Sequence, residues 1–212
     1  MNDLLRRFSI NCHSSIRCGG STVLWFDPFR VAEVPQDGDV IFITHEHYDH
    51  FSPEDLRRVM KPDAVLVLPE SCLAAAEAAG FSRTQLFTVK PEGSYEVRGV
   101  SFRTVPAYNI SKPFHPKASN WVGYVVTVDR QQVYVAGDTD NTPEARAVHC
   151  DAAFLPVGGA YTMTATEAAE LANALHPQAA VPTHYGCIVG EKTDGDVFAA
   201  ALAPAITCIK ML

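Results

Sequence analysis

The stretch Val40-Ile-Phe-Ile-Thr-His45-Glu-His47-Tyr-Asp49-His50 decides the fold, because an apolar run ends directly in four residues that bind transition metals. In an extended segment, residues two apart point the same way, so His45 and His47 can converge on one ion. Asp49 and His50 lie on the turn that follows and face a neighbouring point. Two pairs of ligands at a strand end suit a site with two metal ions ~3.5–4 Å apart.

Two later residues are further ligand candidates, because each of them also ends an apolar run. Asp138 follows Val133–Ala136, and Gly137 before it lets the backbone approach the site closely. A carboxylate there can bridge two cations, although aspartate after glycine is also common in ordinary turns. His184 ends the run Ala179–Thr183, where a packed structural histidine is the alternative to a ligand. Neither position is decisive without the first stretch.

Short apolar runs bounded by glycine, proline and aspartate recur along the chain and predict strands. They cover Val23–Phe26, Val40–Thr44, Ala64–Leu68, Gln85–Val89, Ser101–Val105, Val122–Val128, Val133–Ala136, Ala153–Val157, Ala179–Thr183 and Ile206–Ile209. Helices are predicted from Pro53, with Ser52 as N-cap, to about Met60, over Glu70–Ala79, from the Thr164 capping box to about His176, and over Asp196–Leu202. This order predicts two sheets face to face with helices outside, in a single domain of residues 1–212.

The charge pattern argues against nucleic acid or an anionic membrane as a partner. The 212 residues include 24 acidic and 17 basic ones, for a formal charge of −7, and no cluster of lysine or arginine is longer than a pair. Both of these partners require a concentrated positive field. Six scattered cysteines fit reduced thiols, and the first residues lack a signal-peptide pattern, so we expect a cytoplasmic protein.

In their order along the chain, the motifs resemble the metallo-β-lactamase superfamily. Within it they resemble the branch that contains ascorbate-6-phosphate lactonase and N-acyl-phosphatidylethanolamine phospholipase D. The resemblance covers nearly the whole chain and is much more specific than any single motif. It is carried by Cys12-His-Ser-Ser, Asp27-Pro, His45-x-His-x-Asp-His, Gly137-Asp-Thr and Thr183-His-Tyr-Gly.

The resemblance implies an α/β fold, a four-layer αβ/βα sandwich of two mixed sheets with the site at one edge of both. It implies that Asp49, His50 and His184 hold one of two metals. Asp27 is expected to support the ligand loop. His13 is expected near the site, where it either supports a ligand or contacts substrate.

The other metal is implied to be held by His45, His47 and a third histidine, with Asp138 bridging both ions. Relatives place the third histidine in a Pro-Ala-x-His segment, where this chain has Pro-Ala-Tyr-Asn109. A neutral amide is a poorer zinc ligand than imidazole. Three alternatives follow: this metal binds weakly, His115 swings in from the next loop, or the site works with one ion.

Tyr161 follows a glycine turn at residues 158–159 that resembles a segment lining the site in the family. A phenol there can donate a hydrogen bond to a developing oxyanion or phosphoryl oxygen. Packing against the glycines is the alternative.

Together these residues predict a metal-dependent hydrolase. Zn²⁺ held by these residues, with Mn²⁺ or Fe²⁺ as alternatives, would lower the pKa of a water towards ~7 and so supply a hydroxide for attack on carbon or phosphorus. Asp49 or Asp138 can then accept a proton or deliver one to the leaving group. The branch resembled implies a small ester-like substrate, either a lactone or a phosphodiester. The expected partner is thus a small molecule, and a homo-oligomer is compatible with the sequence.

Two other functions compete with hydrolysis. A metal-binding or small-ligand-binding domain without turnover is the first, and the amide at Asn109 favours it. Redox chemistry on a di-iron centre is the second, but flavodiiron relatives rely on an acidic ligand and a fused flavin domain.

Overall fold

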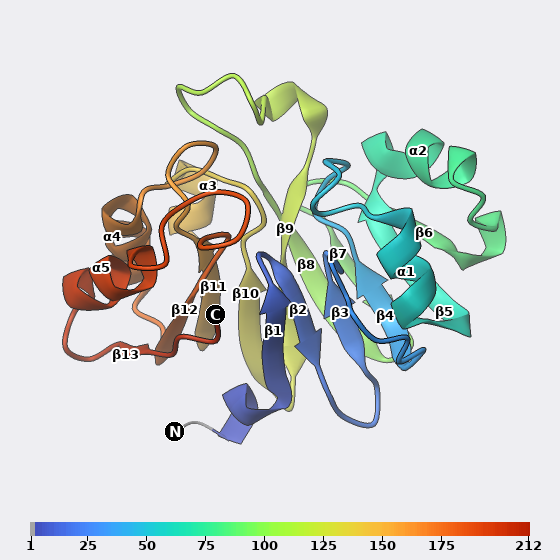
Figure 1. The fold of residues 1–212 in the computed structure, drawn as a ribbon, viewed down its shortest axis with the longest axis horizontal. Coiled ribbons are helices and arrows are strands. Elements are labelled where there is room, and N and C mark those ends of the chain that lie inside the picture. The colour runs from blue at the N-terminus through green and yellow to red at the C-terminus, as the bar shows by residue number, and fades with distance from the viewer. Residues whose placement is uncertain (1–2) are drawn as a thin grey trace.

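A computed structural model describes residues 3–212 and contains two β-sheets packed against each other (Figure 1). The six-stranded sheet has the order β1 (Phe8–Cys12), β2 (Ser15–Cys18), β3 (Leu24–Phe26), β4 (Gly38–Phe42), β5 (Met60–Pro69) and β6 (Leu86–Val89). The seven-stranded sheet has the order β13 (Thr207–Cys208), β12 (Ala179–Thr183), β11 (Ala152–Pro156), β10 (Gln131–Val135), β9 (Val122–Val128), β8 (Val100–Pro106) and β7 (Ser94–Val97). Each sheet combines antiparallel and parallel pairs, which confirms the predicted mixed sheets.

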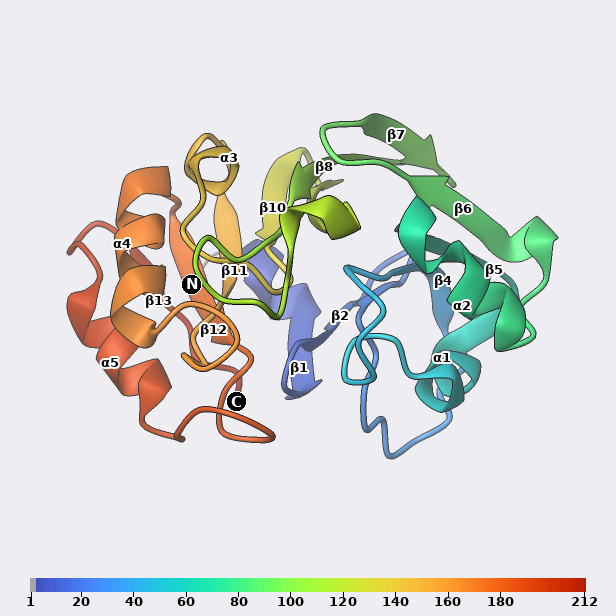
Figure 2. The same cartoon turned by 90° about the horizontal axis from the view of Figure 1, so that it is seen from above.

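Helices cover the outer face of each sheet, as Figures 1 and 2 show. The six-stranded sheet carries α1 (Pro53–Val59) and α2 (Leu73–Ala78), and the seven-stranded sheet carries α3 (Pro143–Arg146), α4 (Ala165–Leu175) and α5 (Asp194–Ala201). Short 3-10 turns lie at Asp3–Arg7, Glu70–Cys72, Arg83–Gln85 and Lys117–Ser119. The four layers therefore follow the order predicted, with helices, sheet, sheet and helices.

Aromatic side chains fill the space between the sheets. The rings of Phe26 and Phe42 stack with centroids 4.9 Å apart, and Phe42 also contacts Tyr124 at 5.0 Å and Phe102 at 5.0 Å. All four side chains are buried. Because large rings bury the most apolar area, the contacts of Phe42 with Tyr124 and Phe102, which lie in the other sheet, hold the sandwich together.

Parallel strands direct the connecting loops to one edge of the sandwich. Strands β3 to β6 run parallel to one another, and so do β10 to β13. The loops that follow β3, β4, β10 and β12 carry most of the predicted site residues. The carboxyl ends of these strands thus bring residues from both halves of the chain together.

Several predicted elements match the structure closely. Strands β9 and β12 have the predicted bounds, and the capping box at Thr164 is present with both of its hydrogen bonds. The predicted helix over Glu70–Ala79 begins as a 3-10 turn and becomes α-helical only at Leu73. The predicted strand over Ile206–Ile209 is reduced to two residues.

Three strands and one helix are absent from the sequence prediction. In β1 and β7, buried and exposed residues alternate, because each strand lies at the edge of its sheet. A search for continuous apolar runs misses such alternation. Strand β2 contains Arg17, and α3 has only four residues.

No helix of residues 3–212 could cross a membrane. The longest, α4, has 11 residues, whereas a span through the hydrocarbon core needs about 20.

The Thr164 cap allows a test of the α4 assignment. Thr164→Ala removes the side chain that accepts from Glu167 N, and we expect the free energy of unfolding to fall by about 1 kcal/mol in urea titrations. Thr193→Ala is the matched control, because Thr193 occupies the N-cap of α5 without a side-chain capping bond. Equal losses in the two variants would contradict the assignment.

Candidate metal centre

A buried carboxylate, Asp27, fixes the ligand loop that follows β4. Its Oδ1 accepts from Thr44 N at 2.8 Å, and its Oδ2 accepts from Thr44 Oγ1 at 2.6 Å. His50 Nδ1 lies 2.8 Å from the same Oδ2 and is therefore the donor, which leaves His50 Nε2 free to face the site. Burial raises the pKa of Asp27, and the charge of His50 and these hydrogen bonds oppose that shift. This geometry supports the predicted role of Asp27 behind the ligand loop.

Three residues of the site have a left-handed backbone conformation that residues other than glycine rarely adopt. The φ angles are 59° at His13, 44° at Asp27 and 60° at His184. Such left-handed residues cluster at functional sites, where the surrounding structure holds them in place.

Gly137 allows the loop after β10 to reach the ligand loop. Its φ is 65°, and a Cβ at this position would lie 2.9 Å from both Cβ and Cγ2 of Thr44. Any larger residue would push the two loops apart. The absence of a side chain therefore brings Asp138 next to the residues that follow β4.

One group of potential metal donors combines residues from three segments of the chain. Donor atoms of His13, Asp49, His50 and His184 all lie within 4.8 Å of one another. Asp49 Oδ2 is 3.2 Å from His13 Nε2, 3.7 Å from His50 Nε2 and 3.8 Å from His184 Nε2. The structure thus brings together three of the predicted ligands and adds His13, for which the sequence predicts a supporting or substrate-contacting role.

A second group consists of His45, His47 and His115, whose donor atoms also lie within 4.8 Å of one another. His45 Nε2 is 3.0 Å from His47 Nδ1, and the rings of His47 and His115 are 5.0 Å apart. The indole of Trp121 packs against the rings of His45 and His47 at 5.0 and 4.8 Å. The third histidine therefore comes from the loop between β8 and β9.

Asp138 lies between the two groups. Its Oδ2 is 3.0 Å from His184 Nε2, 3.2 Å from His115 Nε2 and 3.9 Å from His45 Nε2. Its Oδ1 is 3.3 Å from His50 Nε2. One carboxylate thus faces histidines of both groups, which is the arrangement of a bridging ligand.

Asn109 holds His115 in place. Asn109 Nδ2 donates to Asp140 Oδ1 at 3.0 Å and to the carbonyl of Tyr161 at 2.9 Å, so Oδ1 points toward His115. This oxygen accepts from His115 N at 3.1 Å and from His115 Nδ1 at 3.0 Å. Because Nδ1 carries the proton, Nε2 keeps its lone pair for a metal. Both ends of the Asn109 side chain are therefore engaged by protein partners, and His115 occupies the ligand group in its place.

The buried charges of the site compensate one another. Burial raises the pKa of Asp138, but the charges of His184 and His50 outweigh burial and hold it well below the usual range. Burial lowers the pKa of His50, but Asp138 and Asp27 raise it well above the usual range. Burial raises the pKa of Asp49, but the hydrogen bond from His13 and the charge of His50 outweigh burial and lower this pKa to about 2.

Three other histidines of the site have a lowered pKa, which favours the neutral imidazole. Burial lowers the pKa of His13 to about 4, and burial together with the charge of His50 lowers that of His45 well below the usual range. Burial and His115 lower the pKa of His47. Neutral imidazole is the form that binds a metal, so an ion held by His50 would have to displace the proton of that residue.

The residues present fit a divalent transition metal. His50 Nε2, His115 Nε2 and Asp138 Oδ1 are buried and make no hydrogen bond within the described part of the chain. Buried polar atoms without a partner are costly, and a cation between them would satisfy all three. Imidazole nitrogens and carboxylate oxygens are donors that Zn²⁺, Mn²⁺ and Fe²⁺ accept.

A cavity of about 260 Å³ opens onto the donors. Tyr161 lies at its wall, with 41% of its surface exposed, and its ring contacts Phe114 at 4.7 Å. The full lining comprises His47, Tyr48, Asp49, Phe114, His115, Asp138, Tyr161, His184, Ile188 and Val189.

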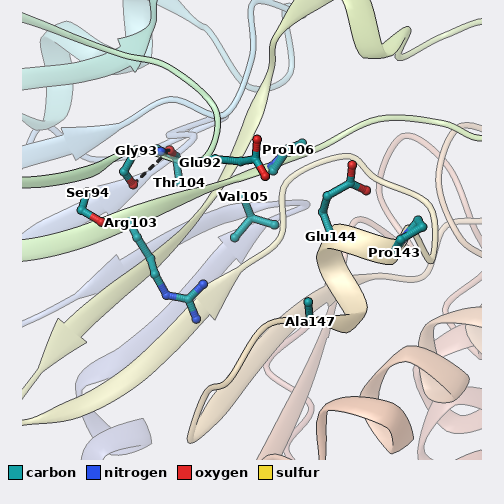
Figure 3. A pocket seen from close by; sticks show the side chains of 10 residues that line it. All are labelled: Glu92, Gly93, Ser94, Arg103, Thr104, Val105, Pro106, Pro143, Glu144 and Ala147. Carbon is teal, nitrogen blue, oxygen red and sulfur yellow. Dashed lines mark hydrogen bonds between the residues drawn. The ribbon is translucent and has the colours of Figure 1, made fainter.

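A second hollow, of about 500 Å³, lies between β7, β8 and α3 (Figure 3). Thr104 Oγ1 accepts from Gly93 N there at 2.9 Å. None of its lining residues belongs to the groups of described residues that could hold a metal. The smaller cavity is therefore the candidate active site.

Comparison with known proteins agrees with this geometry. A family model described as the β-lactamase superfamily domain matches residues 6–185. A UPF0173 metal-dependent hydrolase from Pyrococcus abyssi is 30% identical over 187 residues, which cover 82% of this chain and 81% of that protein. This chain belongs to the metallo-β-lactamase superfamily.

Two solved structures show how far the likeness extends. A protein from Parabacteroides distasonis, assigned as a metal-dependent hydrolase, has a TM-score of 0.80 and 28% identity, and the match covers 96% of this chain and 91% of that one. The metallo hydrolase Igni18 from Ignicoccus hospitalis shares the fold, with a TM-score of 0.75, 22% identity and coverage of 96% and 94%. Among metallo-β-lactamase relatives, this chain is thus placed with metal-dependent hydrolases. Its place in the lactonase and phospholipase D branch stays a prediction.

Two features of this metallo-β-lactamase site escape analysis of the sequence. His13 contributes a donor atom from the turn between β1 and β2, and only its position in Cys12-His-Ser-Ser signals this. Asp140, which accepts from Asn109 and from Lys112, looks like a turn residue in the sequence.

The neutral state of His13 gives the metal-free protein a defined response to acid. The unfolded chain binds a proton at this residue near pH 6.5, whereas the folded chain does so only near pH 4. The contribution of neutral His13 to the free energy of unfolding is therefore fully present above pH 6.5. This contribution, about 3 kcal/mol, is lost as the pH falls from 6.5 to 4. Urea titrations with a chelator present measure this loss.

His13→Asn is expected to flatten that part of the pH profile, because asparagine tolerates the left-handed backbone and does not titrate. His149→Asn, at an exposed histidine outside both donor groups, should leave the slope unchanged. If the free energy of unfolding of His13→Asn decreased with falling pH as steeply as that of the parent protein, the pH dependence could not be attributed to His13.

Proposed function

We propose that this chain hydrolyses a small, uncharged carbonyl ester or lactone at a site with two metal ions. The observation that carries the proposal is Asp138, whose carboxylate lies within 4 Å of histidines from both donor groups. A buried carboxylate in this position supports a bridge between two cations.

The residues divide between two ions. His45, His47 and His115 would hold one, and Asp49, His50 and His184 the other, with His13 beside Asp49 and Asp138 shared. Two such cations, when bound, supply an activated water and polarise the oxygen of the electrophile. Zn²⁺ is the ion we propose, because histidine dominates both groups.

Asp49 and Tyr161 are the residues that would act on substrate. Asp49 has a low pKa and is ionised, so its carboxylate can accept a proton at the floor of the cavity. Tyr161 lines the cavity wall, and its phenol can donate a hydrogen bond to an oxygen that gains negative charge.

The cavity favours a neutral substrate over a phosphodiester. Its wall includes Tyr48, Phe114, Ile188 and Val189, and none of the described residues that line it is lysine or arginine. The nearby loop lysines are engaged elsewhere, since Lys112 pairs with Asp140, and Lys117 with Glu144. An apolar wall without a cationic side chain binds an acyl chain or a lactone ring better than a phosphate.

The ligand groups also favour hydrolysis over di-iron redox chemistry. The group of His45, His47 and His115 has no carboxylate of its own, whereas flavodiiron relatives rely on an acidic residue among their ligands and on a fused flavin domain.

Metal content tests the two-ion assignment. We expect two Zn²⁺ per chain by plasma mass spectrometry after dialysis against zinc-buffered solution, and one in His115→Ala. Asn109→Ala leaves His115 in the chain but removes the partner that orients the His115 imidazole. The affinity for the ion at this group should therefore fall by about 10–100-fold. Asn141→Ala is the control, since the Asn141 side chain accepts from Arg146 and belongs to none of the donor groups among the described residues. Two tightly bound ions in His115→Ala would contradict the assignment.

A substrate panel tests the reaction. The zinc-loaded enzyme should cleave p-nitrophenyl butyrate and γ- and δ-lactones with kcat/KM at least ~100-fold above that for bis-p-nitrophenyl phosphate. Asp49→Asn should lose most of kcat and bind its second zinc ion more weakly, because an amide is a poorer ligand than the carboxylate it replaces. Preference for the phosphodiester would overturn the substrate class. Full zinc occupancy without turnover of any compound would favour the binding domain instead.

A further inference from the structure

Two cysteines from opposite sheets meet beside the metal centre. Cys12 ends β1 in the six-stranded sheet, and Cys187 follows β12 in the seven-stranded sheet. Their sulfur atoms are 2.6 Å apart, although 175 positions separate them in the sequence. A disulfide bond measures about 2.05 Å between its sulfurs, so the folded chain already holds the two thiols close to bonding distance.

The surrounding backbone fixes this approach. His184 N donates to the carbonyl of His13 at 3.1 Å, and the two imidazole rings lie 3.7 Å apart. Cys12 directly precedes His13, and Cys187 lies three residues after His184. The two turns are thus tied together independently of the thiols.

Solvent reaches the pair. Cys187 is exposed and Cys12 is partly exposed, and both line a cavity of about 670 Å³ that is separate from the proposed substrate cavity. Arg30 Nη1 lies 3.3 Å from Cys187 Sγ, and Lys192 lines the same cavity. Exposure and the neighbouring cations favour oxidation at Cys187. Burial raises the pKa of Cys12 to about 12, so Cys12 is not the thiol that oxidises first.

We propose that Cys12 and Cys187 form a reversible disulfide that joins the two sheets next to His13 and His184. This modification site goes beyond the hydrolytic function and does not depend on it. A hydroperoxide oxidises the exposed Cys187 thiol to a sulfenic acid and is itself reduced to an alcohol, or to water if it is hydrogen peroxide. The Cys12 thiol then attacks the sulfenic sulfur, the S–S bond forms, and one water leaves. Dithiol reductants reverse the reaction by exchange.

The disulfide stabilises the sandwich because it restricts the unfolded chain. The bond would close a loop of 175 residues between the two sheets. Long loops give large entropic effects, and we expect the melting temperature of the metal-free protein to rise by about 5–10 °C.

The test uses the full chain, freed of metal with a chelator and treated with hydrogen peroxide. The number of free thiols should fall from six to four. Combined digestion with trypsin and chymotrypsin should give a peptide pair joined through Cys12 and Cys187 that dithiothreitol separates. Cleavage after Arg17 and Tyr185 keeps this pair distinct from Cys18 and Cys150.

Variants distinguish the proposed order of steps. Cys12→Ser should trap Cys187 as a sulfenic acid that dimedone labels, and Cys187→Ser should leave Cys12 unmodified, both without a rise in melting temperature. Cys208→Ser, at a partly exposed thiol outside the pair, should still form the disulfide. Six free thiols after oxidation, modification of Cys187 alone in the parent, or a bond between other cysteines would overturn the proposal.

Discussion

The buried negative charge of Asp138 is the constraint on which the site depends. A carboxylate with 3% exposure is stable only if opposite charge or strong hydrogen bonds surround it. Histidines supplied by three different segments meet this demand, and Asp27 in turn compensates His50 from behind. The result is a network in which every charged group has a partner from a distant part of the chain.

The sandwich makes this convergence feasible. Strands that run parallel within each sheet end at one edge, so loops from the two halves of the chain face each other across a single seam. Contacts across the seam are close. Gly137 lies against Thr44, and the turn at His13 lies against the turn at His184. The geometry of the donors is thus set by packing between sheets rather than by any one loop.

The sequence predicts the local parts of this arrangement and misses those that depend on folding. The run from His45 to His50 is visible because its ligands are adjacent and follow an apolar strand. Asp138 and His184 become convincing only through their order in the family pattern. By contrast, Asn109 stands where relatives have a histidine, and the sequence does not decide between weak metal binding, a ligand role of His115 and a site with one ion. Spacing alone does not tell where the loop places His115. Edge strands such as β1 are missed for a related reason, because their alternating pattern gains meaning only from the neighbouring strand.

The single loop between β8 and β9 has a consequence for how such an enzyme can change. It supplies both a donor, His115, and a wall residue, Phe114, while the amide of Asn109 also bonds the backbone at Tyr161. The selectivity of the cavity and the affinity for the ion at His115 therefore depend on the same loop. A lineage that reshapes this loop for a new substrate alters its metal chemistry by the same substitutions, so new specificities should arise more readily on the opposite wall, at Ile188 and Val189.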